Sequence, residues 1–319
     1  MRYQLIPKTD LNAAVICLGT GGLGSVTDRE TSFRMLDAYL DAGGNFIDTA
    51  KVYADWLPGE RSISEKTIGA WVNARGNRSK VILATKGAHP DLSSMSVPRL
   101  SAGEIVSDLD ASLKHLGTDT IDLYWLHRDD PERPVEDILR TLAQQTKAGK
   151  LRYFGASNWK VERLKAAQDW AYQNQVSGFV ASQIFWNIGL PDPERIGDKT
   201  IAFMDASTWR YHVDSGLAVL AYTSQANGYF TRRAAGEAVS ETLRQVYHQV
   251  ENEARLECIR ALSGQTGLSA SQIGLAYLTC QPFPAFPIIG SRTQEQLEDS
   301  LTAADVTLTP GQVSYLVNL

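Results

Sequence analysis

Short apolar runs alternate along this chain with longer stretches whose apolar residues recur every three or four positions. The short runs predict β-strands, and the longer stretches predict amphipathic helices. Each predicted strand is followed by a predicted helix. The eight predicted strands span residues 15–19, 45–48, 81–86, 121–127, 152–156, 181–184, 217–222 and 286–289.

These strands are continuous apolar runs, which is typical of parallel strands that are covered on both faces. Eight strand–helix repeats are also the number that closes a barrel. The sequence therefore predicts an α/β fold, a (β/α)8 TIM barrel, formed by residues 1–319 as one domain.

Two segments fall outside the repeat. We expect residues 2–5 to form a short hairpin that plugs the bottom of the barrel, and the polar segment 225–253 to form a loop-plus-helix insertion over the mouth.

Several helix starts carry a hydroxyl residue with Glu or Gln three positions later, which predicts capping boxes. These pairs are Thr27 and Glu30, Ser62 and Glu65, Ser101 and Glu104, and Ser269 and Gln272.

Four polar residues stand at or just after the ends of predicted strands. Asp48 ends one strand, Tyr53 follows it, Lys86 ends the next and His127 ends the one after. In a parallel barrel these strand ends meet at one mouth, where the active sites of such barrels lie. The four residues then suit protonation of a carbonyl oxygen, with Tyr53 as the acid.

Each of the four also has a simpler interpretation when it is taken alone. Asp48 and Lys86 could form a structural ion pair, and Tyr53 could be an ordinary loop aromatic. His127, which precedes Arg128, could lie in a solvated polar turn. The catalytic interpretation is favoured because all four are predicted at the same face of the barrel.

A glycine-rich segment, residues 19–24, matches the pattern G-x-G-x-x-G of dinucleotide-binding Rossmann folds. In those folds the third glycine lies in the first turn of the helix. Here the helix is predicted to begin only near Thr27, so Gly24 lies outside it. We instead expect a flexible loop at the barrel mouth, where Gly21 and Gly22 let a flat ligand approach the backbone.

Composition narrows the function further. A formal charge of −5 with no basic block gives no indication of a nucleic-acid partner, and no apolar run is long enough to span a membrane. Three cysteines without close spacing favour a reducing compartment, so a cytoplasmic location is expected. The five histidines show no metal-ligand spacing, and no metal is expected.

With these residues in place, the chain resembles the aldo-keto reductase superfamily over nearly its whole length. The matching segments occur in the family's order, and their joint spacing carries the resemblance. They are residues 19–24, 45–50 with Tyr53, 64–65, 85–86, 121–124 with His127, 155–158, Gln183, 289–292 and 295–297.

The resemblance implies reduction of an aldehyde or ketone with NADPH, which binds across the barrel mouth. It implies that Asp48, Tyr53, Lys86 and His127 form a catalytic tetrad. The cofactor-binding residues that follow are Gly21, Gly22, Asp48, Ser157, Asn158, Gln183, Tyr222, Thr223, Gln225, Asn227, Ile289, Gly290, Ser291, Arg292, Gln296 and Ser300. Among them Ser157, Asn158 and Gln183 would hold the carboxamide, and Tyr222 would stack on the nicotinamide.

Within this implied site, Gln225 and Asn227 would offer amide donors to the pyrophosphate. Ser291, Arg292 and Gln296 would hold the adenosine 2′-phosphate and ribose. A guanidinium pairs well with a phosphate, so Arg292 favours NADPH over NADH.

This chain departs from the family in three places. After Tyr222 the family commonly has serine, proline and leucine, whereas this chain has residues 223–225, Thr-Ser-Gln. The family's late Glu-Asn pair at the adenine is replaced by Asp299 and Ser300. The insertion 225–253 has no family-wide pattern to carry over.

The substrate pocket is predicted to include Tyr53, His127 and Trp56, whereas Trp125 is expected in the core because it lies within a strand. The partner is a small carbonyl compound whose identity the sequence leaves open, together with the direction of reaction and the oligomeric state. Two other functions also remain open. One is an NADPH-holding regulatory subunit similar to potassium-channel β subunits, and the other is a non-redox barrel enzyme without the cofactor.

Overall fold

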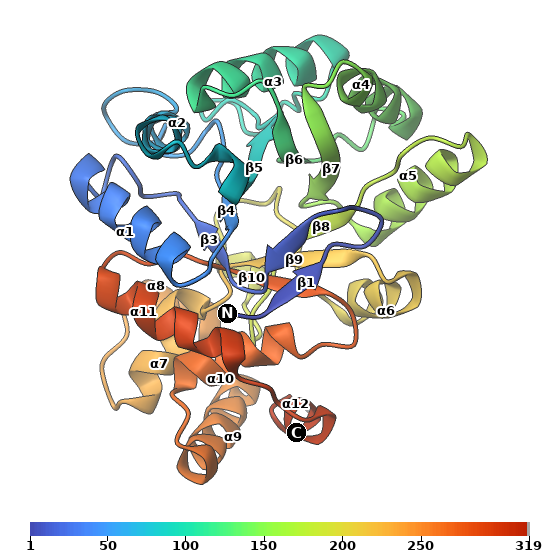
Figure 1. The fold of residues 1–319 in the computed structure, drawn as a ribbon. Coiled ribbons are helices and arrows are strands. Elements are labelled where there is room, and N and C mark those ends of the chain that lie inside the picture. The colour runs from blue at the N-terminus through green and yellow to red at the C-terminus, as the bar shows by residue number, and fades with distance from the viewer. Residues whose placement is uncertain (318–319) are drawn as a thin grey trace.

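Eight parallel strands close into a barrel in the computed structural model, which describes residues 1–317. The strands follow one another around the barrel in chain order, and β10 pairs with β3 to close it (Figure 1). Each lies within two residues of its predicted bounds, and the (β/α)8 prediction is confirmed. The barrel strands are β3 (Cys17–Gly19), β4 (Phe46–Asp48), β5 (Ile82–Gly87), β6 (Ile121–Leu126), β7 (Leu151–Ser157), β8 (Ala181–Phe185), β9 (Ala218–Tyr222) and β10 (Ala285–Ile289).

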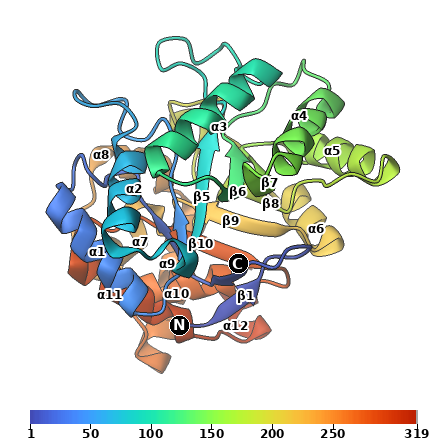
Figure 2. The same cartoon turned by 45° about the horizontal axis from the view of Figure 1, so that its top comes forward.

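Helices surround the barrel on its outside (Figures 1 and 2). The α-helices are α1 (Arg29–Asp41), α2 (Ile63–Arg75), α3 (Ala102–Leu116), α4 (Val135–Lys147), α5 (Val161–Gln173), α6 (Ala206–Ser215), α7 (Tyr229–Ala234), α8 (Glu241–Tyr247), α9 (Val250–Thr266), α10 (Ala270–Thr279), α11 (Gln294–Thr302) and α12 (Pro310–Tyr315). Short 3₁₀ turns are η1 (Arg78–Lys80), η2 (Pro193–Arg195), η3 (Ala226–Gly228) and η4 (Ala303–Asp305). No helix in residues 1–317 is long and apolar enough to cross a membrane.

Two of the four predicted capping boxes are confirmed, at Ser101 before α3 and at Ser269 before α10. The box predicted at Thr27 is wrong, because α1 begins one residue later and the Asp28 side chain caps it. The box at Ser62 is also wrong: Ser62 lies in the left-handed region (φ 55°) and makes no capping bond. Its predicted partner, Glu65, is instead buried and accepts a hydrogen bond from Thr85 Oγ1.

The barrel interior is apolar and is closed at the N-terminal ends of the strands by a hairpin. Strand β1 (Tyr3–Leu5) pairs with β2 (Asn12–Ala14), as predicted for residues 2–5. Ile6 and Leu11, in the connection between them, are buried against the inward-facing side chains of the barrel strands. Trp125 belongs to the same cluster and is fully buried, so its predicted core role is confirmed.

The insertion after β9 is more helical than the sequence predicted. Residues 225–253 contain η3, α7, α8 and the start of α9, because Tyr229, Phe230, Val246 and Tyr247 are buried in a second apolar core outside the barrel. Helices α7 to α9 lie on the side of the barrel opposite α3 and α4 (Figure 1). They contact the loop after β8, where Asn252 bonds to the backbone of Leu190 and the Asp192 N–H donates to the Val246 carbonyl.

The glycine-rich loop after β3 does not open a helix. Gly24 lies five residues before the first residue of α1, Arg29, and has a φ of 76°. A β-carbon at Gly24 would also overlap the Thr67 hydroxyl, so both conformation and space require glycine here. The structure thus agrees with a barrel-mouth loop and excludes the Rossmann arrangement.

Candidate active site

The four predicted catalytic residues converge at the C-terminal end of the barrel. Asp48 is the last residue of β4, Lys86 is the last but one residue of β5, and His127 directly follows β6. Tyr53 reaches the same place from the turns after β4. The side chains of Asp48 and Lys86 are each only 1% exposed, so this is a buried ionic centre.

The Lys86 ammonium is the hub of this centre. Its Nζ donates to Asp48 Oδ2 at 2.5 Å, to the Thr49 carbonyl at 2.7 Å and to Tyr53 Oη at 3.0 Å. An ammonium has three N–H donors, so these three bonds fix its orientation. The other carboxylate oxygen, Asp48 Oδ1, accepts from Gln183 Nε2 at 3.0 Å.

Burial and charge act against each other on this pair. Burial raises the pKa of Asp48, and the adjacent Lys86 opposes that rise without cancelling it. Burial would lower the pKa of Lys86, but Asp48 and Tyr53 outweigh it and the net change in that pKa is upward. Lys86 therefore remains an ammonium at neutral pH.

The Tyr53 phenol is protonated at neutral pH. Burial raises its pKa, while the Lys86 ammonium, 4.6 Å from the ring centroid, acts to lower it. The sequence indicates the effect of the lysine, but burial exceeds it and the net change in the pKa of Tyr53 is upward. A protonated phenol held beside a cation can release its proton more readily than an isolated buried phenol.

His127 is a neutral imidazole beside the phenol. Its ring centroid lies 6.0 Å from that of Tyr53 and 4.7 Å from that of His89. Burial lowers the pKa of His127 well below its ordinary value, and the nearby Arg128 guanidinium adds to this effect. Its Nδ1 is buried without a hydrogen-bond partner in the described residues. A neutral ring can donate one N–H to an oxygen that gains negative charge.

The residues predicted to hold the carboxamide are neighbours: Ser157 ends β7, Asn158 follows it, and Gln183 lies opposite Ser157 in β8. Asn158 adopts the left-handed conformation (φ 63°), which asparagine tolerates. Its Nδ2 donates to the His127 carbonyl and to Ser157 Oγ, and its Oδ1 accepts from Tyr222 Oη at 2.6 Å. Asn158 is thus fully engaged within the protein, whereas Gln183 keeps a second N–H and its carbonyl oxygen.

A second group of predicted cofactor residues lies at the rim beside β9 and β10. Gln225 Nε2 donates to Ser300 Oγ and to Ser271 Oγ, both at 3.0 Å, and Ser300 Oγ donates to the Gln296 carbonyl. The backbone N–H of Arg292 donates to Gln296 Oε1. The amide of Gln225 is therefore occupied and does not face the mouth as a free donor.

The remaining predicted cofactor residues lie in loops at the same end of the barrel. Thr223 and Asn227 have φ values of 55° and 50° in the turns after β9. A β-carbon built at Gly21 would lie 3.9 Å from the Tyr53 ring, which places this loop beside the phenol. The others are Gly22 after β3, and Ile289, Gly290 and Ser291 at the end of β10 and after it.

Trp56, predicted as a pocket wall, lies edge-to-face with Tyr53 at a centroid distance of 6.3 Å and is 55% exposed. It lines a cavity of about 1040 Å³ between the loops after β4 and β5. His89 and Leu92 line the same cavity. Its role in holding a substrate stays a prediction.

Arg128 and His89 are site residues that the sequence argument missed. The Arg128 guanidinium donates to Asp198 Oδ2 at 2.7 Å, to Thr200 Oγ1 at 2.7 Å and to the His127 carbonyl at 2.8 Å. It is 8% exposed, so the solvated polar turn considered for this segment is wrong. The loop that supplies Asp198 follows β8, and no pattern near Arg128 indicates that distant partner.

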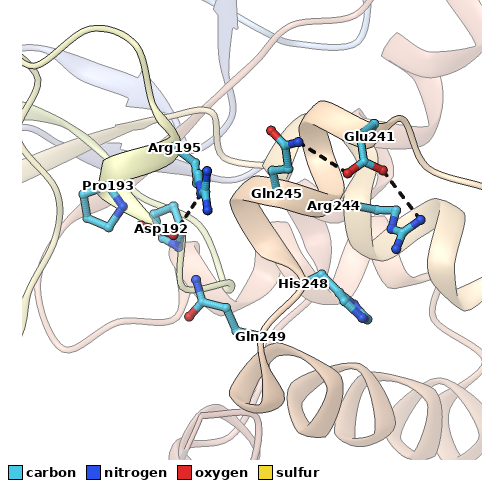
Figure 3. A pocket seen from close by; sticks show the side chains of 9 residues that line it. Asp192, Pro193, Arg195, Glu241, Arg244, Gln245, His248 and Gln249 are labelled. Atoms are coloured by element: carbon cyan, nitrogen blue, oxygen red, sulfur yellow. Dashed lines mark hydrogen bonds and ion pairs between the residues drawn. The ribbon is translucent and has the colours of Figure 1, made fainter.

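A separate cavity of about 480 Å³ lies between η2 and α8 (Figure 3). Its charged side chains are paired locally, with Arg195 Nε 3.8 Å from Asp192 Oδ2 and Arg244 Nη1 3.6 Å from Glu241 Oε2. None of the four predicted catalytic residues lines it. In residues 1–317, no cluster of three or more His, Cys, Asp or Glu side chains is arranged to hold a metal ion.

Comparison with known proteins agrees with this geometry. The sequence model of the aldo/keto reductase family matches residues 15–319. The chain is 32% identical over 314 residues to an uncharacterized oxidoreductase of Bacillus subtilis, covering 97% of this chain and 92% of that protein. It is 30% identical over 341 residues to an aryl-alcohol dehydrogenase [NADP(+)] of Phanerodontia chrysosporium, covering 98% and 84%.

A norsolorinic acid reductase of Emericella nidulans is 32% identical over 324 residues, covering 97% of this chain and 79% of that protein. A barrel that holds the Tyr53 phenol against the buried Lys86–Asp48 pair, together with these matches, defines an oxidoreductase. The chain belongs to the aldo/keto reductase family.

We predict that His127 stays neutral well below pH 6.5. Because its folded pKa is depressed, the unfolded chain binds the proton more readily, and the free energy of unfolding declines as pH falls below about 6.5. NMR of the imidazole carbons, assigned with His127→Gln, measures this directly. Urea-denatured protein gives the reference titration. A folded His127 signal that titrates near pH 6.5 would contradict the assignment.

Proposed function

We propose that this protein is an NADPH-dependent reductase of an aldehyde or ketone, with Tyr53 as the general acid. The observation that carries the proposal is the contact of Tyr53 Oη with the buried Lys86 ammonium at 3.0 Å. No other buried ammonium–phenol contact occurs in the described residues. The family membership supports the carbonyl-reducing chemistry.

Reduction requires that the carbonyl oxygen gain a proton while its carbon gains a hydride. The protonated Tyr53 phenol supplies that proton, and Lys86 stabilises the phenolate that remains. Asp48 keeps Lys86 charged and in place through the 2.5 Å contact. In alcohol oxidation the same phenolate accepts the proton.

His127 stabilises the substrate oxygen by donating an N–H to it. A neutral imidazole suits this role, because its hydrogen bond strengthens as negative charge develops on the oxygen. The bond from Asn158 to the His127 carbonyl, together with that from Arg128, holds the residue at the strand end. His127 and Tyr53 then contact the same oxygen from two sides.

Bound NADPH would supply the hydride. Ser157 and Gln183 have hydrogen-bonding capacity for its carboxamide, while Asn158 must exchange a partner to bind it. Tyr222 lies beside them, where it can pack on the nicotinamide ring. Ser291 Oγ is buried without a partner in the described residues, which fits an acceptor group such as a phosphate.

Turnover decides between an enzyme and a regulatory subunit that only holds the cofactor. An aryl aldehyde is the first assay substrate, because one relative is named an aryl-alcohol dehydrogenase and because Trp56 lies against Tyr53. Tight NADPH binding with negligible aldehyde reduction would favour the regulatory function.

The three cysteines are free in the described residues, so we also propose a reducing, cytoplasmic location.

We predict that Tyr53→Phe lowers kcat by about 10²- to 10⁴-fold, because it removes the proton donor. The ring remains, so the NADPH dissociation constant should change little. Steady-state kinetics on the best aldehyde and a fluorescence titration with NADPH measure the two effects. A kcat of Tyr53→Phe equal to that of the parent would contradict the role of Tyr53 as the acid.

We predict that Arg292→Ala weakens NADPH binding far more than NADH binding, because the exposed guanidinium would lose its phosphate partner. Loss of one charge-assisted hydrogen-bond pair should raise the NADPH dissociation constant by about tenfold or more. Arg210→Ala, an exposed arginine on α6, is the matched control. Equal weakening for both dinucleotides would refute the 2′-phosphate assignment.

A further inference from the structure

His89 is a buried imidazole that the proposed reaction does not use. It follows β5 in the loop that begins beyond Gly87, and it is 9% exposed. Its ring centroid lies 4.7 Å from that of His127, with an interplanar angle of 66°. His89 therefore lies next to the position where the substrate oxygen would bind.

One contact fixes the tautomer of this ring. His89 Nδ1 lies 2.6 Å from the Pro90 carbonyl oxygen, which can only accept a hydrogen bond. Nδ1 must therefore carry the proton. Burial lowers the pKa of His89, and Arg128 adds to this effect, so the ring is neutral at neutral pH. A neutral ring with its proton on Nδ1 has a bare lone pair on Nε2.

The free lone pair has no partner within the part of the chain that the structure describes. Nε2 is also not among the fully buried side-chain atoms of residues 1–317 that lack a partner, so it is accessible to a ligand. The residue also lines the cavity of about 1040 Å³ beside Trp56. The site thus combines an N–H donor on His127, for the carbonyl oxygen, with an acceptor on the neighbouring His89 ring.

We propose that His89 is a specificity-determining residue that accepts a hydrogen bond from a hydroxyl on the carbon next to the substrate carbonyl. The preferred substrates are then α-hydroxy aldehydes or ketones, and the products are vicinal diols. A substrate without that hydroxyl displaces water from the acceptor and leaves it unpaired, which costs affinity. This inference rests on the proposed carbonyl reduction.

The geometry also explains why a hydroxyl, and not a second carbonyl, is the favoured group. A carbonyl oxygen would place a lone pair against the lone pair of Nε2. A hydroxyl can donate to Nε2 while the carbonyl oxygen of the same substrate lies beside the Tyr53 and His127 donors. Arg128 is already bonded to Asp198 and Thr200, so it does not compete for this hydroxyl.

The test compares lactaldehyde with isobutyraldehyde, which differ by a hydroxyl in place of a methyl group. The measured quantity is the ratio of their kcat/KM values in the parent, in His89→Phe and in His89→Gln. Comparing one ratio across variants cancels the different hydration of the two aldehydes. We expect the ratio to fall about tenfold in His89→Phe, which keeps a ring but lacks the acceptor.

His89→Gln keeps a side-chain carbonyl acceptor and should hold the ratio closer to the parental value. A ratio that is unchanged in His89→Phe would overturn the proposal, because a purely structural role through His127 would affect both aldehydes alike. A ratio that falls equally in His89→Gln would also count against an acceptor role.

A binding experiment separates this inference from the proposed function. Glycolamide and propanamide carry the same hydroxyl-for-methyl exchange but are not reduced. Calorimetry should show tighter binding of glycolamide to the parent in the presence of NADP⁺, and loss of that preference in His89→Phe. If the parent reduces neither these two aldehydes nor the aryl aldehyde, the proposed carbonyl reduction is contradicted, and the preference between the two amides still decides the role of His89. Equal binding of the two amides to the parent would overturn it.

Discussion

The structure of the site depends on one buried charge, the Lys86 ammonium. An ammonium without a partner at 1% exposure would be very unfavourable, so its three contacts must be present together. The Asp48 carboxylate, the Thr49 carbonyl and the Tyr53 phenol come from β4 and the turns that follow it, while Lys86 comes from β5. Holding that one cation therefore fixes the relative positions of two neighbouring strand ends and of the phenol.

The rest of the mouth is organised around this centre by side chains that bond to one another and to the backbone. Gln183 satisfies the second oxygen of Asp48, and Asn158 and Arg128 both donate to the His127 carbonyl. Arg128 also holds the loop after β8 through Asp198. These contacts involve β4 to β8, so a disturbance at one strand end reaches the others. The proposed proton donor and oxyanion stabiliser thereby share one rigid frame.

Much of the fold follows from the sequence, because apolar runs and glycine positions are local signals. These signals predicted the eight strands, the hairpin and the convergence of Asp48, Tyr53, Lys86 and His127. The cap at Asp28 and the helices of the insertion were missed, because a hydroxyl–Glu spacing at Thr27 imitates a cap and buried aromatic residues are scattered in a polar segment. The place of Arg128 depends on Asp198, and the role proposed for His89 depends on its contact with the His127 ring. Both contacts join residues far apart in the chain, and no local pattern encodes them.

The central claim is that the Lys86 ammonium stabilises the Tyr53 phenolate, and the pKa of Tyr53 tests it most directly. Protein labelled with ¹³C at the tyrosine ring is titrated by NMR, with Tyr53→Phe to assign the signal. Lys86→Met removes the charge and keeps most of the side-chain volume. We expect a higher Tyr53 pKa in Lys86→Met than in the parent. An equal or lower pKa would contradict it.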